Sequence, residues 1–270
     1  MPQQLLSDRI PGQSVMAKLL STHRLDPPRT FLGRLLGSSP LGRDSRPWYQ
    51  GALGEIAVAG RLGTLGPEWT VLHSVPVGNG SSDIDHVIIG PGGVFTVNTK
   101  NHASQTVWVA GRTFMVAGQK QRHIPNAVHE AGRASSLLGR AANAPVGVRP
   151  LIVVVNPKSL TIKEAPAGVV VLTDGQLERW LRSRPPVLGP DMVARVAKAA
   201  IQPGTWRHRP LEHEDAIAMW KAFEAVPLLV ERALRRQAGW ALALLACPFA
   251  ALLATISGVP GHVLQLLLRH

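Results

Sequence analysis

Two residues of this sequence, Asp85 and Lys100, have the types and the spacing that phosphate chemistry needs. They stand in two apolar, β-branched runs, IDHVIIG and VFTVNTK, separated by proline and glycines, and this pattern predicts a β-hairpin. A turn centred on residues 91–92 places Asp85 opposite Asn98, whereas a turn centred on residues 92–93 places it opposite Lys100. Because side chains alternate along a strand, Asp85, Asn98 and Lys100 share one face in both registers.

Side chains of these types suit the hydrolysis of a phosphodiester bond. A divalent metal held by carboxylates polarises the phosphate and lowers the pKa of an attacking water, and a nearby cation stabilises charge on the phosphate. Asp85 and Lys100 supply one acid and one cation, and Glu55, in a preceding predicted helix, can add a second carboxylate. Asp83 shares the strand face of Asp85 and can assist it. An acid and a lysine on either side of a turn are also common, and polar residues at strand ends often only meet solvent.

The surrounding pattern predicts a mixed α/β fold in which a central sheet is flanked by helices. WYQGALGEIAVAGRLGTLG carries apolar residues at helical spacing and ends in glycines. TVLHSVPVG, the hairpin and a second hairpin that turns near Gly111 predict strands. A helix over about residues 126–142 follows, then two buried strands, RPLIVVVNP and GVVVLTDG, and a helix capped by Thr173 or Asp174.

This pattern divides the chain into four parts. We expect a basic, flexible N-terminal arm over residues 1–47, the α/β domain over 48–184, a linker with short helices over 185–236, and a hydrophobic segment over 237–270.

The hydrophobic segment contains AGWALALLACPFAALLATIS, residues 238–257, which carries no charge and is long enough as a helix to cross a bilayer. Arg232, Arg235 and Arg236 precede it, and the positive-inside rule then keeps the main domain on the cytoplasmic side. We therefore expect a cytoplasmic protein that is anchored to the inner face of the cell membrane. The alternative is a hydrophobic helix, bent at Pro248, that packs on the main domain.

The composition bears on partners and metals. A net charge of +12 favours polyanionic partners such as nucleic acid or anionic lipid, although a basic, solvated surface explains the charge equally well. The single cysteine, Cys247, excludes an internal disulfide and a cysteine-based zinc site. The segment HEAGR, with His129 and Glu130, lacks the second histidine of the HExxH motif, so we exclude a zinc protease site. We also expect no secretory signal at the N-terminus.

Two strings, GALGEIAVAGRL and DIDHVIIGPGGVFTVNTKNH, resemble the nuclease-related domain (NERD) family of the PD-(D/E)XK nuclease superfamily, over about residues 50–182. The resemblance implies a restriction-endonuclease-like fold in which Glu55 is the helix acid, Asp85 the principal metal ligand and Lys100 the catalytic lysine. The second carboxylate of the family, in its E-x-K motif, is Asn98 here. An asparagine can offer a carbonyl oxygen to a metal but brings no negative charge.

The resemblance therefore implies a nuclease that depends on Mg²⁺ or Mn²⁺ and acts on DNA, with Glu55, Asp85 and Asn98 around the metal and Lys100 at the phosphate. The alternative is a nucleic-acid-binding or scaffold module with the same fold, in which Asn98 has weakened the metal site and ended turnover. Cleavage assays of DNA with divalent metal separate the two hypotheses.

Overall fold

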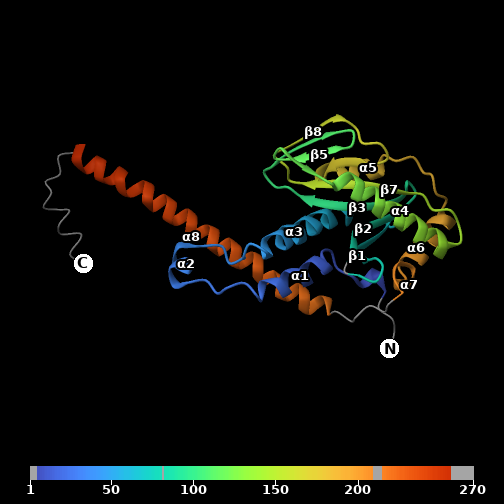
Figure 1. Cartoon of the computed structure of the whole chain (residues 1–270), viewed down its shortest axis with the longest axis horizontal. Coiled ribbons are helices and arrows are strands. Elements are labelled where there is room, and N and C mark those ends of the chain that lie inside the picture. The colour runs from blue at the N-terminus through green and yellow to red at the C-terminus, as the bar shows by residue number, and fades with distance from the viewer. Residues whose placement is uncertain (1–4, 81, 209–214, 257–270) are drawn as a thin grey trace.

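The strands of this chain form two sheets in a computed structural model that describes residues 5–80, 82–208 and 215–256 (Figure 1). The first sheet has the order β1-β2-β3-β7-β9, with strands β1 (Thr70–Pro76), β2 (Asp83–Gly90), β3 (Gly93–Asn101), β7 (Val148–Val155) and β9 (Val170–Thr173). The second sheet has the order β6-β5-β4-β8, with strands β6 (Gln119–Gln121), β5 (Thr113–Val116), β4 (Thr106–Ala110) and β8 (Ser159–Glu164).

The prediction of a mixed α/β fold is confirmed, but the single central sheet is corrected to two sheets. In the first sheet, β1, β2 and β3 are antiparallel neighbours, and β7 and β9 then add in parallel. The second hairpin, β4 and β5, turns at Gly111 as predicted, but it pairs with β6 and, in parallel, with β8. Strand β8 has the sequence SLTIKE, in which most side chains are exposed, so no apolar run marked it in the sequence.

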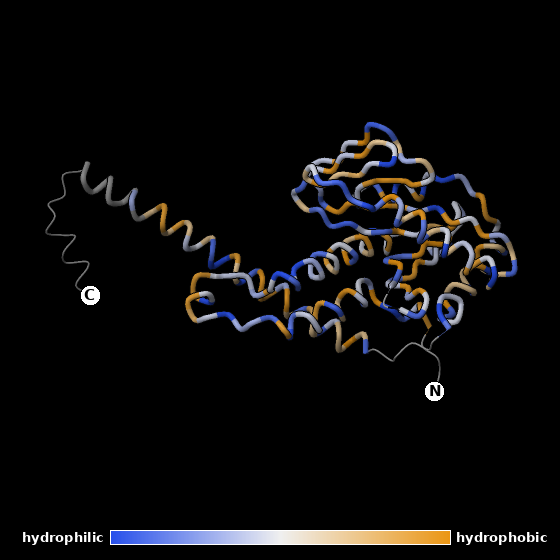
Figure 2. Tube along the Cα trace, in the orientation of Figure 1, coloured by the Kyte–Doolittle hydropathy of each residue, from blue (hydrophilic) through white to orange (hydrophobic). Residues whose placement is uncertain are grey.

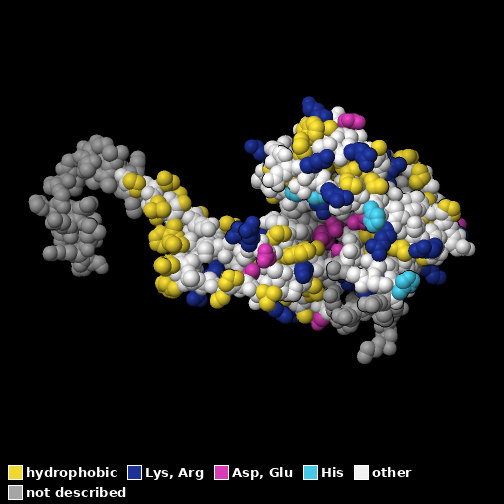
Figure 3. All heavy atoms as spheres, in the orientation of Figure 1, with side chains coloured by type: hydrophobic (Ala, Val, Ile, Leu, Met, Phe, Trp, Pro, Cys, Tyr) yellow, Lys and Arg dark blue, Asp and Glu magenta, His cyan; other side chains and the backbone are white. Residues whose placement is uncertain are grey.

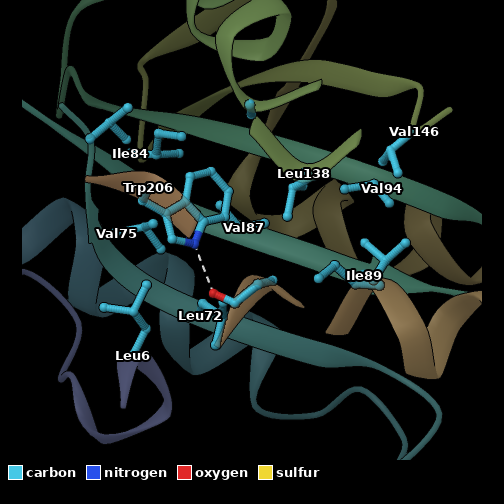
Figure 4. Packing of buried hydrophobic residues seen from close by; sticks show 14 of the residues in the cluster. Leu6, Leu72, Val75, Ile84, Val87, Ile89, Val94, Leu138, Val146 and Trp206 are labelled. Carbon is cyan, nitrogen blue, oxygen red and sulfur yellow. Dashed lines mark hydrogen bonds between the residues drawn. The ribbon is translucent and has the colours of Figure 1, made fainter. Parts of the chain in front are cut away.

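Helices cover both faces of the first sheet. One face packs against α4 (His123–Ala142), α6 (Pro190–Ala200) and α7 (Pro203–Trp206), and Figure 4 shows this apolar layer with Trp206 at its centre. The other face packs against α3 (Ser45–Leu62) and α5 (Asp174–Arg182). The predicted cap of α5 is Thr173, which forms a reciprocal capping box with Gln176. The side chains of β2 and β3 that alternate between these faces therefore meet α4 on one side and α3 on the other.

The N-terminal region differs from the flexible arm that the sequence led us to expect. It contains η1 (Leu6–Asp8), α1 (Gln13–His23) and α2 (Phe31–Leu36), and the side chains of Leu6, Met16 and Leu19 are fully buried. Helix α1 packs against α3 and against the long helix α8 (Ala216–Ile256). The short apolar runs of this region are thus buried by elements that follow much later in the chain.

Helix α8 joins two segments that the sequence had divided at residue 236. Its first half contributes Phe223 and Val226 to a buried cluster with α1 and α3, and its second half extends away from the body (Figure 1). Apolar side chains on the extending half are exposed, including Leu242, Leu244 and Leu245. Figure 2 shows hydrophobic residues along the described part of this half. None of the described helices combines the length and the apolar character that a membrane span requires. The final residues of the predicted hydrophobic segment, 257–270, lie outside the described part.

Candidate functional site

The register of the β2–β3 hairpin decides which residues face Asp85. Gly90 pairs with Gly93 and His86 with Val97, so the turn centres on residues 91–92. Continuing this register by one residue places Asp85 opposite Asn98, the first of the two predicted arrangements. The Asp85 Oδ2 atom accepts a hydrogen bond from the backbone N–H of Thr99, with an N···O distance of 2.6 Å. This bond holds the carboxylate against the edge of β3, beside the strand face that carries Asn98 and Lys100.

Glu55 approaches from α3 because a glycine precedes it. A Cβ atom at Gly54 would lie 3.0 Å from the Asn101 Cβ and 3.2 Å from the Thr99 Cγ2, so α3 and the end of β3 are in close contact. The Glu55 side chain is 3% exposed, and its Oε2 accepts a hydrogen bond from the Ser74 hydroxyl at 3.5 Å. The sequence GE therefore combines a close helix–strand approach with a buried acid.

Glu130 is the acid that the sequence reasoning did not assign to this site. From α4, its Oε2 accepts a hydrogen bond from the Asn98 side-chain amide at 3.3 Å. The Glu130 Oε1 and the Asn98 Oδ1 are both buried without a hydrogen-bond partner among the described residues. The stem of Glu130 is partly exposed, but its carboxyl end points inward. A carboxyl group from α4 is thus present next to Asn98.

The electrostatics of the cluster reflect buried like charges. Burial, together with the charges of Asp85 and Asp83, raises the pKa of Glu55 well above its ordinary value. Burial and Asp85 raise the pKa of Glu130 to about 8. Burial also raises the pKa of Asp85, while the Lys100 ammonium and the hydrogen bond from Thr99 oppose this change. Figure 3 shows acidic side chains gathered near the middle of the molecular face, with histidine and basic side chains beside them.

The N-terminal region reaches this cluster through Arg9. The Arg9 side chain is 6% exposed, and it donates hydrogen bonds to the Ser74 carbonyl at 2.7 Å and to the Ser14 hydroxyl at 3.0 Å. Burial and Asp85 raise the pKa of Asp83 to about 6, and Arg9 and Ser14 partly offset this. Residues that we expected in a flexible arm therefore contribute positive charge and hydrogen bonds next to the acidic cluster.

Two histidines border the site on the side of Lys100. His102 follows β3 and His123 begins α4, and their Nε2 atoms lie 3.4 Å apart. Burial and the Lys100 ammonium lower the pKa of both rings, that of His123 to about 3. The His123 and Phe114 rings pack in a T-shaped arrangement with a centroid distance of 4.9 Å. The two neutral imidazole rings therefore pack together next to Lys100.

The oxygen atoms of the cluster suit a hard divalent cation. Unpartnered buried oxygens belong to Asp83, Asn98 and Glu130, and carboxylate and carbonyl oxygens are the ligands that Mg²⁺ prefers. Within the described residues, no three or more histidine, cysteine, aspartate or glutamate side chains are arranged so that they could hold a metal ion. Mg²⁺ is usually bound by only one or two carboxylates and keeps several waters. The cluster fits such an open site better than a closed protein cage.

The structure thus brings together most of the residues that the sequence singled out. Asn98 and Lys100 are two residues apart on β3, and Asp85 and, from α3, Glu55 each interact electrostatically with Lys100. Glu130 was missed because HEAGR was tested only as a zinc motif, and nothing in the sequence indicates that α4 crosses this face of the sheet.

Comparison with known proteins identifies one family. The model of the nuclease-related domain (NERD) family matches residues 50–155. No curated protein and no solved structure matches the chain. The matched segment extends from α3 to the end of β7, and it includes every acid discussed above as well as Asn98 and Lys100.

Proposed function

Residues 50–155 belong to the nuclease-related domain family, and from this premise we propose that the protein hydrolyses phosphodiester bonds in DNA with the help of Mg²⁺ or Mn²⁺. The observation that carries the proposal is the contact between Asn98 and Glu130 beside Asp85. The carboxyl group that the E-x-K motif lacks at position 98 is supplied by α4, so a second acid is present at the site and can give up its proton when a cation binds.

In this proposal Asp85, Glu130 and the Asn98 carbonyl would hold the metal, and Glu55 would add charge from α3. A metal bound there polarises the phosphate and lowers the pKa of a coordinated water. Thr99 keeps the Asp85 carboxylate in place through its backbone N–H. The Lys100 ammonium stabilises the negative charge that develops on the phosphate as the new phosphorus–oxygen bond forms and the bond to the leaving oxygen breaks.

The direct test is cleavage of plasmid and single-stranded DNA by the full chain with Mg²⁺ or Mn²⁺. We expect Asp85→Asn and Lys100→Met each to lower the cleavage rate by roughly 100-fold or more, the size of effect seen when one charge-stabilising group is removed from an active site. Asp191→Asn and Lys198→Met change exposed residues of α6 and serve as matched controls. These controls should cleave DNA at the wild-type rate.

Cleavage that persists in both Asp85→Asn and Lys100→Met would assign any activity to another site or to a contaminant. Wild-type protein that binds DNA but does not cleave it with either metal would favour the second candidate function.

That second candidate is a nucleic-acid-binding module without turnover. It is favoured by Asn98 in the motif and by the finding that no three described histidine, cysteine, aspartate or glutamate side chains are placed to hold a metal. It predicts DNA binding that weakens with salt and does not depend on divalent metal. The Asn98→Glu variant tests its origin, because a gain of metal binding and cleavage would indicate a nuclease that has lost one ligand.

We also propose that the protein is cytoplasmic and associates with the inner face of the membrane through the extending half of α8. The support is a set of exposed apolar side chains next to Arg235 and Arg236. Fractionation of the full chain tests this, with Leu242→Gln/Leu245→Gln as the variant. Equal amounts of wild type and variant in the membrane fraction would exclude the apolar surface of α8 as the attachment.

A further inference from the structure

A pocket that the nuclease proposal does not use lies along helix α4, near the turn between β1 and β2. Its volume is about 810 Å³. The residues that matter for its chemistry come from the turn, from α4 and from the segment after α6, namely Gly78, Arg133, Arg140, Trp206, Arg207 and His208.

The charge of this pocket is uncompensated. Three arginines line it, and no described aspartate or glutamate does. Within the described residues, none of the three guanidinium groups takes part in an ion pair. The Nε of Arg207 is in addition buried without a hydrogen-bond partner among those residues. Buried donors that lack a partner are uncommon in proteins, and here the donor belongs to a cation in a pocket lined by two others.

The wall of the pocket is held in place by burial and by hydrogen bonds. Trp206 is 1% exposed, and its indole Nε1 donates a hydrogen bond to the Ala200 carbonyl at 2.7 Å (Figure 4). The backbone N–H of Gly78 donates to the Trp206 carbonyl at 2.9 Å and so joins the turn to this segment. A side chain at Gly78 would overlap the guanidinium of Arg133, so the glycine leaves the space that the arginine occupies.

We propose that this pocket binds the phosphodiester backbone of the nucleic-acid strand that the acidic cluster acts on. Guanidinium groups donate paired hydrogen bonds to phosphate oxygens and keep their charge at any physiological pH. The inference rests on the proposed function for the identity of the ligand. It extends that function by assigning a second contact with the strand, which positions it without touching the reacting phosphate.

The geometry of α4 connects the two sites. Arg133 and Arg140 follow Glu130 by three and ten residues, which at 1.5 Å per residue is about 5 and 15 Å along the helix axis. They are seven residues apart and therefore lie on the same side of α4. A nucleic-acid strand carries several phosphates over about 15 Å, since successive charges are roughly 3.4 Å apart per strand in the duplex. The turn that borders the pocket also leads directly into Asp83, at the same end of the sheet as Asp85.

The test is the binding of a fluorescein-labelled single-stranded DNA oligonucleotide to the full chain, measured by anisotropy over a series of NaCl concentrations in EDTA. The variant is Arg133→Gln/Arg140→Gln. The control is Arg149→Gln/Arg179→Gln, which removes the same charge from exposed positions on β7 and α5. We expect the pocket variant to bind about tenfold more weakly at low salt and its log–log salt slope to fall by about 1.4, the value for two lost phosphate contacts on a single strand. The control should change affinity less than twofold.

Equal weakening in the pocket variant and the control would overturn the inference, because the arginines would then act only through net charge. A free phosphate ligand is distinguished by titration with inorganic phosphate and with adenosine monophosphate. Binding of either compound that depends on Arg133 and Arg140, together with unchanged DNA binding in the variant, would also overturn the assignment to a strand.

Failure of this inference can be told apart from failure of the proposed function. If the wild type cleaves DNA and the pocket variant binds and cleaves DNA equally well, only the inference about the pocket is rejected. If the protein binds DNA through Arg133 and Arg140 but does not cleave it, the nuclease proposal is rejected and the inference about the pocket stands.

Discussion

Helix α4 borders two regions that each hold like charges, and the two regions carry that charge in different ways. On one side Glu130 joins Asp85 and Glu55 in an acidic cluster, where burial raises the pKa of each carboxyl. Further along the helix, the exposed Arg133 and Arg140 line a pocket together with Arg207, whose Nε is buried. A buried acid can take up a proton when no cation is present, whereas an exposed arginine stays charged.

The difference shows what each region lacks. The acids are stable together only with protons or with nearby cations, and Lys100 and Arg9 supply part of that positive charge. Arg133 and Arg140 remain solvated without a ligand, so their grouping lowers stability little and is suited to an anion that binds and leaves. Removing charge from the acidic cluster should therefore change stability and metal binding, and removing it from the arginine pocket should change only DNA binding.

The largest effect expected from this comparison is on stability at alkaline pH. Folded Glu130 keeps its proton up to about pH 8, while in the unfolded chain the proton leaves near pH 4.5. The folded state then binds more protons than the unfolded state, so stability falls as the pH rises from 4.5 to 8. We expect Glu130→Gln to be more stable than wild type by roughly 2–4 kcal/mol at pH 8.5, and nearly equal to it at pH 4.5.

Urea unfolding of the two proteins at both pH values measures this difference. Adding Mg²⁺ at pH 8.5 should stabilise wild type more than Glu130→Gln, because the ion supplies the missing counter-charge. A stability difference that is the same at both pH values would mean that Glu130 is not held protonated in the fold.

The next effect concerns metal affinity and the place of the second acid. Glu130→Gln should weaken Mn²⁺ binding by at least about 10- to 100-fold, the loss that is typical even for a group that only supports a metal ligand. The double variant Asn98→Glu/Glu130→Gln moves the carboxylate back to the strand and should bind Mn²⁺ within a few-fold of wild type. Calorimetry measures both affinities, with Asp191→Asn as the control for loss of an exposed acid.

If the double variant is folded but binds Mn²⁺ no better than Glu130→Gln, the idea that α4 supplies the missing carboxylate is wrong. The result would then favour a module without a metal.

The smallest effect concerns the arginine pocket and its glycine. Gly78 has φ +73° and contacts the Arg133 guanidinium, so Gly78→Ala should shift that side chain and strain the turn. We expect DNA affinity to fall about twofold and the stability to fall by about 1 kcal/mol. Gly80→Ala is the matched control, since a Cβ at Gly80 meets no atom within 4 Å. A Gly78→Ala variant that binds DNA like the control would show that the position of Arg133 does not matter.

Local sequence patterns were sufficient for the hairpin and for most elements of the α/β body. Alternation along IDHVIIG and VFTVNTK placed Asp85, Asn98 and Lys100 on one face in either register, and the strands pair in one of the two predicted registers. Helical periodicity predicted α3 and most of α4, whose bounds are Ser45–Leu62 and His123–Ala142. These features depend on residues that are close together in the chain, so they can be predicted from a single sequence.

Contacts between distant segments were not predictable in the same way. Strand β8 is mostly exposed and shows no apolar run, and it becomes a strand because β4 offers it an edge. The N-terminal region was expected to be flexible because its apolar runs are short, yet α1 is covered by α3 and α8. Glu130 likewise gave no signal, since its role depends on which face of the sheet α4 covers.

By itself, the sequence determined the order of most elements, the strand face that carries Asn98 and Lys100, and the presence of an amide rather than an acid at position 98. Only the tertiary structure decided that Glu130 lies beside Asn98, that Arg9 interacts electrostatically with Asp83 and that three arginines line one pocket. The physical reason is that spacing along a strand or a helix specifies only which way neighbouring side chains point over a few residues. The packing of whole elements, through burial of their apolar faces, specifies which charges from distant segments meet.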